Sequence, residues 1–152
     1  MSDVNPITMV WHLVARFVTS LPPTPPSVHD ELWVDERLSD GERALWVQLS
    51  NQDRRHSAAV AQRFVQERPT ATDAEIAGAI LHDVGKIDCG LGTFGRVVAT
   101  FVGPRGRSFS SYHDHEDIGA EMARLAGSDS ATVELIAQRG PAFDALEASD
   151  HA

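Results

Sequence analysis

Apolar residues recur every three or four positions along most of the chain, which is the spacing of one face of a helix. Serine, threonine, asparagine and aspartate precede these stretches as N-cap residues, and proline or glycine ends them. No stretch alternates apolar and polar residues as a half-buried strand does. The chain is therefore predicted to be all-α with short connections. The first predicted helices begin after the caps Ser27, Ser39, Asn51 and Thr72. The later ones cover Thr93–Val102, His113–Ala126, Asp129–Arg139 and Ala142–Asp150.

Two of these starts have the form of a capping box, in which the cap residue and the residue three positions later bond each other's backbone. They are Ser39 with Glu42 and Thr72 with Glu75. Proline and glycine set the helix ends, because proline lacks a backbone donor and glycine readily ends a helix. The expected ends are about Arg68 before Pro69, near Gly85, Gly127 and Gly140.

The N-terminal part differs in pattern from the rest of the chain. The segment Pro6–Leu21 is apolar, but His12 and Arg16 interrupt it and it is shorter than the ~20 apolar residues of a membrane span. We expect neither a transmembrane helix nor a signal peptide. Its apolar stripe fits a helix packed on its own domain or on a partner, or an interfacial membrane helix. The expected division is an amphipathic helix and proline-rich linker at 1–26, followed by one helical domain at 27–152.

Composition narrows the class of protein. A chain of 152 residues suits one domain with one core. Its formal net charge of −9 lacks the positive field of a nucleic-acid-binding protein, so no nucleic-acid partner is expected. The single cysteine, Cys89, excludes an intramolecular disulfide framework and a cysteine-rich zinc site. A cytoplasmic location fits that cysteine count.

The adjacent pair His82-Asp83 is the strongest sign of chemistry. It lies at the end of an apolar helix, where burying a histidine beside an aspartate needs a compensating partner. A metal ion is one such partner, since imidazole and carboxylate both bind zinc, iron and manganese. Two interpretations remain at this point, a metal site or a salt bridge at a helix end. Further ligands for a metal are available at His56, His113, His115 and Asp150.

Four motifs together resemble the HD-domain superfamily of metal-dependent phosphohydrolases. They are the His56 segment RRHSAAVA, the segment AILHDVGK with His82 and Asp83, the segment HEDIGAE beginning at His115, and a late aspartate. The resemblance covers about residues 50–150, and the third segment is similar to the HDIG-type branch. The whole chain also resembles small bacterial HD proteins. The fold implied by the resemblance is a compact multi-helix HD-domain bundle.

The resemblance implies the ligands of one divalent metal ion, which are His56, His82, Asp83 and Asp150. Asp144 is the weaker substitute for the last of these. Manganese, iron, zinc, cobalt and nickel all suit such ligands. His115 matches the extra histidine of branches with two metals, but the stretch from 136 to 140 lacks their next histidine. Cyclic-dinucleotide phosphodiesterases carry a GYP loop that is absent here, so that substrate class is not expected.

Basic residues gather directly after the His-Asp pair. The stretch from Lys86 to Arg107 carries a charge of +3 in a chain whose net charge is −9. Arginine and lysine are the usual partners of phosphate oxygens, although a solvated loop with scattered arginines gives the same pattern. The candidate phosphate-binding residues are Lys86, Arg55, Arg96, Arg105 and Arg107.

These observations favour a divalent-metal-dependent phosphohydrolase acting on a phosphomonoester or phosphodiester, with a nucleotide as the substrate class implied by the resemblance. In that hypothesis Lys86 steadies the phosphate, while Asp83 or His115 orients the water or protonates the leaving oxygen. The alternative is a metal- or nucleotide-binding sensor with little turnover. The sequence gives neither the oligomeric state nor the physiological role.

Overall fold

The computed structural model describes residues 24–90 and 114–152, and within these residues the protein is all-α. This confirms the predicted fold class at the level of all-helical architecture. The described part holds seven α-helices, one 3₁₀-helix and no strand. In chain order they are α2 (Val28–Asp35), α3 (Asp40–Trp46), α4 (Asn51–Glu67), α5 (Asp73–Ile80), the 3₁₀-helix η1 (Val84–Gly90), α7 (Asp114–Leu125), α8 (Ser130–Ile136) and α9 (Phe143–Asp150). The predicted amphipathic helix in Pro6–Leu21 and the predicted helix Thr93–Val102 lie outside the described residues.

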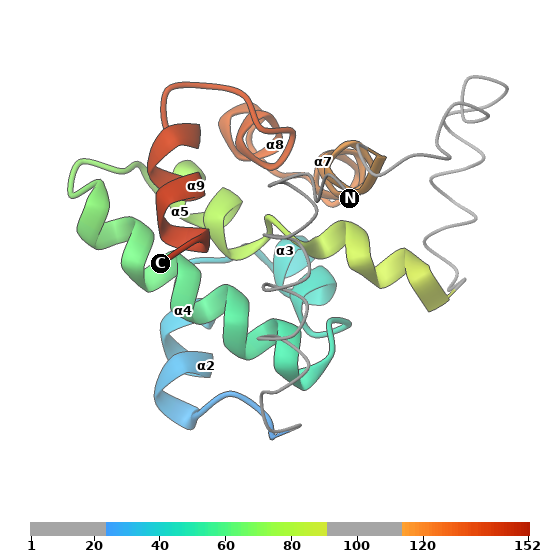
Figure 1. Ribbon diagram of the computed structural model, residues 1–152. Helices are drawn as coiled ribbons and strands as arrows, with labels where there is room; N and C mark the ends of the chain where they lie inside the picture. Colours follow the sequence, from blue (N-terminus) through green and yellow to red (C-terminus); the bar gives the residue numbers. More distant parts are fainter. Residues whose placement is uncertain (1–23, 91–113) are drawn as a thin grey trace, which may run out of the picture.

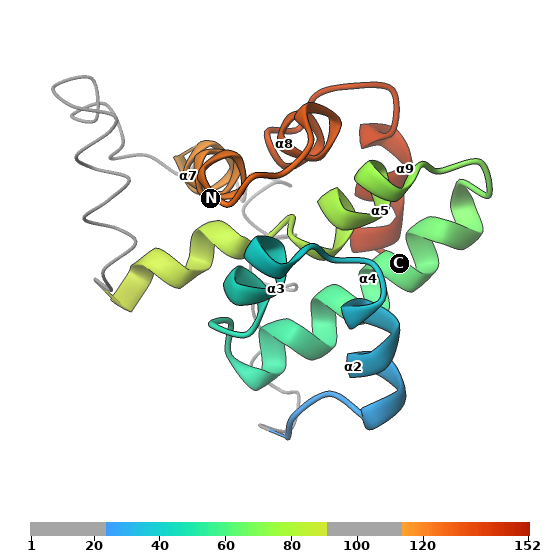
Figure 2. The same ribbon diagram turned by 180° about the vertical axis from the view of Figure 1, so that it is seen from behind.

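The longest of the described helices, α4, supports the elements that carry the candidate site. It packs against α5 and α9 and also contacts α2, while α5 lies between α4 and α8 (Figure 1). On the other side of α8 lies α7, which also packs against η1, as the reverse view shows (Figure 2). The helices of residues 24–90 and 114–152 include none that is long and apolar enough to cross a membrane.

The core is filled by large apolar side chains from all parts of this bundle. Trp46 of α3 is 1% exposed, and its indole nitrogen donates to the hydroxyl of Ser57 on α4 at 3.0 Å. Pairing this N–H offsets the cost of burying it. Other fully buried side chains are Phe64, Leu45, Ile80, Leu81, Met122, Leu135 and Ile136. The apolar faces predicted from helical spacing therefore meet in one core.

Helix starts agree closely with the cap pattern. Ser27 caps α2, and both predicted capping boxes are present. One cap differs from the prediction: α4 is capped by Ser50, whose hydroxyl accepts from the backbone nitrogen of Asp53 at 3.1 Å. Asn51 is instead the first helical residue. The neighbouring serine takes the extended backbone that a cap requires.

Helix ends were predicted less well. The helix capped by Thr72 stops at Ile80 instead of near Gly85, and the chain turns at Leu81–Asp83 before the 3₁₀-helix η1. The predicted end of α8 at Arg139 is also wrong, because α8 stops at Ile136 and Gln138 takes a left-handed φ of 63°. Gly127, with a φ of 89°, does follow the end of α7 as predicted.

A close helix crossing joins α7 to η1. A Cβ atom added to Gly119 would lie 3.0 Å from the backbone nitrogen of Gly85. That distance is tighter than most Cβ contacts in proteins, so a methyl group at residue 119 would push the two backbones apart by a few tenths of an ångström. The glycine of the HEDIGAE segment therefore brings α7 against the segment that follows the His-Asp pair.

Candidate metal centre

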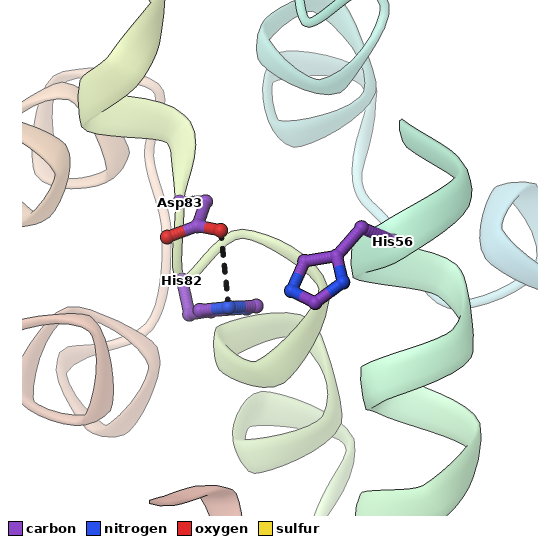
Figure 3. Close-up of side chains that lie close together, drawn as sticks. All are labelled: His56, His82 and Asp83. Carbon is purple, nitrogen blue, oxygen red and sulfur yellow. Dashed lines mark ion pairs between the residues drawn. The ribbon is translucent and has the colours of Figure 1, made fainter. Parts of the chain in front are cut away.

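Two histidines and an aspartate from different elements point toward one another (Figure 3). His56 comes from α4, whereas His82 and Asp83 come from the turn between α5 and η1. Each offers one ligand atom, and these atoms lie within 4.8 Å of one another. The centres of the two imidazole rings are 6.1 Å apart. The packing of α4 against α5 thus brings together residues separated by a long stretch of sequence.

Asp150 joins this group from the end of α9. Its Oδ1 atom lies 2.9 Å from Nε2 of His56 and 3.6 Å from Nε2 of His82. His56 and Asp150 are 94 positions apart, and they meet because α9 packs against α4. Asp144, at the start of the same helix, is exposed. Of the two late aspartates, the structure therefore brings Asp150 to the cluster.

The ring of His82 has a fixed orientation. Its Nδ1 atom donates to the backbone carbonyl of Ala79 at 2.7 Å, since a carbonyl can only accept. This bond places a hydrogen on Nδ1 and leaves Nε2 as the nitrogen facing the cluster. A metal-binding histidine usually makes a hydrogen bond of this kind, in which the ring nitrogen that does not bind the metal donates to a carbonyl.

The Nε2 atom of His82 is buried and has no hydrogen-bond partner among the residues that the structure describes. It lies 3.3 Å from Oδ2 of Asp83 and 3.6 Å from Oδ1 of Asp150. A nitrogen lone pair directed at two carboxylates is unfavourable unless a positive charge lies between them, either a proton on Nε2 or a metal ion. Buried polar atoms are rarely left unpaired, so this one points to a cation.

The carboxylates carry their charges at neutral pH. Burial by itself raises the pKa of the Asp83 carboxyl, but the His82 ring and the Lys86 ammonium outweigh it and hold the pKa well below its ordinary value. Burial likewise opposes ionisation of Asp150, yet its contacts with His56 and His82 keep its pKa far below the ordinary value. Ionised carboxylates are the form that binds metal ions.

The same charges act on His82 in the opposite direction. Burial lowers the pKa of its imidazole, but the carboxylates of Asp83 and Asp150 outweigh burial and raise the pKa well above its ordinary value. The cluster thus stabilises positive charge at the point where the two carboxylates and His82 meet.

Lys86 lies beside the cluster and pairs with it. Its Nζ atom is 3.1 Å from Oδ2 of Asp83 and 4.0 Å from Oδ1 of Asp53. Burial lowers the pKa of this ammonium, but Asp83 and Asp53 outweigh burial, so the pKa is raised and the group stays charged. Sequence reasoning named Lys86 and missed Asp53. The signal was available, because Asp53 precedes His56 by three positions and so lies on the same face of α4.

The donor set suits one divalent cation. Donors bonded to a single ion at about 2.0–2.2 Å lie about 3–3.5 Å from their neighbours. The separations here are 2.9 Å for His56–Asp150, 3.3 Å for His82–Asp83 and 3.6 Å for His82–Asp150. With both imidazoles neutral, as metal ligands are, the carboxylates of Asp53, Asp83 and Asp150 with the Lys86 ammonium leave two negative charges. One divalent ion would balance them.

Most of the other predicted site residues lie outside the described residues. Arg55 lies on α4, and its guanidinium donates to the hydroxyl of Thr24. His115 belongs to α7, and its side chain lies outside the described residues. Also outside them are His113, Arg96, Arg105 and Arg107.

The chain matches no protein-family profile, no curated protein and no solved structure. What the chain does must therefore be argued from the four donors, from the lysine beside them and from the sequence motifs that carry them.

Proposed function

We propose that this protein is a divalent-metal-dependent phosphohydrolase of the HD-domain type, acting on a phosphomonoester or phosphodiester. The observation that carries the proposal is the buried Nε2 atom of His82, which faces two carboxylates without a hydrogen-bond partner in the described residues. The motif resemblance supports the same assignment, and it makes a nucleotide the expected substrate class.

The metal ligands in this proposal are His56, His82, Asp83 and Asp150. A divalent ion held by them would supply Lewis acidity toward a phosphoryl oxygen and would lower the pKa of a bound water. The chain's own part is to keep the four donors in the required states. The bond from His82 to the carbonyl of Ala79 keeps Nε2 directed at the cluster, and the depressed pKa values keep both carboxylates ionised.

Exposure gives the direction from which a substrate would approach. The imidazoles are nearly buried, with 8% exposure for His56 and 9% for His82. The side chains of Asp83, Asp150 and Lys86 are more open, at 22%, 31% and 33%. The histidines thus form the floor of the cluster, whereas the carboxylates and the ammonium border the solvent.

Lys86 is the described cation best placed to meet a phosphate group. Its ammonium is charged, one-third exposed and next to Asp83. Lysine binds phosphate as a compact point charge, and it is a poor metal ligand while protonated. Proton transfer in this proposal falls to Asp83, or to His115 as the sequence motif suggests.

The test uses the full chain purified without chelators. We expect about one divalent ion per chain by elemental analysis, and hydrolysis within a panel of nucleotides and other phosphoesters supplied with manganese, iron, zinc, cobalt or nickel. Asp83→Ala should lose both the ion and the activity. Asp144→Ala, which changes an exposed aspartate of α9, is the matched control and should keep both.

Two results would count against the enzyme. A folded wild-type chain that binds none of the five metals would remove the basis of the proposal. A chain that binds one metal and nucleotides, but hydrolyses no phosphoester faster than Asp83→Ala, would instead be the sensor that the sequence left as the alternative.

A further inference from the structure

Arg63 links the helix that carries His56 to the helix that carries Asp150. It follows His56 by seven positions on α4, which is close to two helical turns, so the two residues lie on the same face. The Nε atom of Arg63 donates to the backbone carbonyl of Ser149 at 2.9 Å. Ser149 immediately precedes Asp150 in the last turn of α9.

This contact satisfies a group that α9 cannot satisfy by itself. Carbonyls in the last turn of a helix lack partners within that helix. A guanidinium is well suited to them, because its positive charge also interacts favourably with the negative end of the helix dipole. Ser149 is 1% exposed, and its hydroxyl donates to the carbonyl of Ala145 at 2.8 Å. The backbone next to Asp150 is therefore held by a buried residue and by Arg63.

The contact with Arg63 matters for Asp150 because of where this residue lies in α9. Asp150 is the final residue of α9, and the last residues of a helix fray readily. Its carboxylate nevertheless has to stay within 2.9 Å of His56 and 3.6 Å of His82. Two residues on one face of α4 hold Asp150 in this position: His56 contacts its side chain, and Arg63 binds the carbonyl of the preceding residue.

We propose that Arg63 is a positioning residue of the metal centre, which fixes Asp150 as a ligand by holding the end of α9 against α4. The proposal rests on the proposed function, because it assumes that Asp150 binds the metal. Arg63 itself binds neither the metal nor the substrate in this assignment.

Cobalt(II) is the probe for the test, because its visible absorption depends on the number and kind of its ligands. The full chain is titrated with cobalt(II) as wild type, Arg63→Ala, Arg63→Lys, Asp150→Ala and the double variant of Arg63→Ala with Asp150→Ala. Arg124→Ala is the control, since this exposed arginine pairs with Glu121 on its own helix. Far-ultraviolet circular dichroism shows which variants are folded.

We expect Arg63→Ala to lower cobalt affinity about 10-fold to 100-fold, as is typical for loss of a group that orients a ligand. Its absorption should shift toward that of Asp150→Ala. Arg63→Lys should recover part of the affinity, because an ammonium can also donate to the Ser149 carbonyl. The double variant should bind cobalt no more weakly than Asp150→Ala alone, because Arg63 acts only through Asp150.

Wild-type affinity and absorption in Arg63→Ala would overturn the proposal, and so would losses that add in the double variant. If Arg63→Ala does not fold, Arg63→Lys decides: a folded lysine variant with wild-type affinity and absorption overturns the proposal, whereas a change toward Asp150→Ala supports it. A wild-type chain that binds no cobalt and none of the other metals overturns the proposed function itself. A failure limited to the arginine variants leaves that function standing.

Discussion

The Nε2 atom of His56 lies 2.9 Å from Oδ1 of Asp150, across 94 positions of sequence. Neither residue has a local reason to meet the other, because one lies in the second turn of α4 and the other ends α9. The contact exists because those two helices pack together. A cation bound between them would therefore join separate parts of the fold, and this has a measurable consequence for stability.

Removing the metal should lower the melting temperature. An ion that binds only the folded state, at a free concentration 100 times its dissociation constant, stabilises that state by about 2.7 kcal/mol. Treatment with a chelator should cancel this gain, and resupplying the metal should restore it. In Asp83→Ala the melting temperature should not respond to chelator. Equal responses in wild type and Asp83→Ala, measured by differential scanning calorimetry, would contradict a metal bound at this cluster.

Lys86→Ala should separate phosphate binding from metal binding. The ammonium pairs with Asp83 and Asp53, and it is a phosphate partner in the proposed function. The variant should weaken the binding of inorganic phosphate to the metal-loaded chain, measured by calorimetry, while the metal content by elemental analysis stays the same. Lys86→Arg should keep more of the phosphate affinity, because it keeps the charge. Loss of metal without loss of phosphate affinity would show that the assigned role is wrong.

Gly119→Ala should destabilise the fold by about 1–3 kcal/mol, the usual cost of overpacking. The added methyl group would lie 3.0 Å from the backbone nitrogen of Gly85, where α7 crosses η1. Chemical denaturation measures the change. In an open helical position the same substitution stabilises by about 1 kcal/mol, because alanine is the better helix former. A gain in stability would thus show that the two backbones are not in close contact.

Gln138→Gly should stabilise the protein by about 0.5–1 kcal/mol. Gln138 has a φ of 63°, a left-handed conformation that glycine adopts without strain. The substitution gives up only an exposed hydrogen bond to Glu116. We expect a rise in melting temperature of about 1–4 °C. Gln138→Ala is the control, since it removes the same hydrogen bond and keeps the strain. A glycine variant no more stable than the alanine variant would argue against strain at this position.

The contacts of the Glu75 carboxylate predict part of the loss of folding stability at acid pH. Burial raises the pKa of its carboxyl, but the Thr72 backbone and Arg68 outweigh burial and hold the pKa below its ordinary value of 4.5. A lowered folded-state pKa contributes stability that is complete above the unfolded-state pKa and is lost as the pH falls through the folded-state pKa. Wild type should therefore exceed Glu75→Gln in unfolding free energy at pH 6–7.

That difference should shrink as the pH drops below about 4.5. Comparing the two proteins at each pH cancels the titration of all other groups that they share. Urea denaturation at several pH values provides the measurement, and a difference that stays constant down to pH 3 would contradict the assignment.

The features that depend on neighbours in sequence could be predicted well. Both capping boxes lie within four residues, and their hydrogen bonds follow from residue type and spacing. The end of α5 was harder, because apolar Leu81 and Val84 are both buried. The apolar pattern therefore continues across the point where the α-helix stops and η1 begins.

The same distinction between local sequence and helix packing applies to the candidate site. His56, His82, Asp83 and Asp150 could be named from motifs, but the distances among them depend on how α4, α5 and α9 pack. Pairings such as Arg63 with Ser149 join positions 86 apart, and nothing in either local segment indicates them. A stripe drawn along α4 from His56 would have marked Asp53 and Arg63 as neighbours of the site without giving their partners.

The route by which the donors are assembled has a consequence for the order of folding. His56, His82 and Asp83 lie in one stretch that consists of α4, a connection, α5 and the turn after it, whereas Asp150 arrives from much farther along the chain. Closing the longer loop costs more entropy, and contacts between distant positions form more slowly. During refolding, the first three donors should therefore come together before α9 docks. A metal ion added at the start of refolding would find a partial site, and the docking of α9 would complete it.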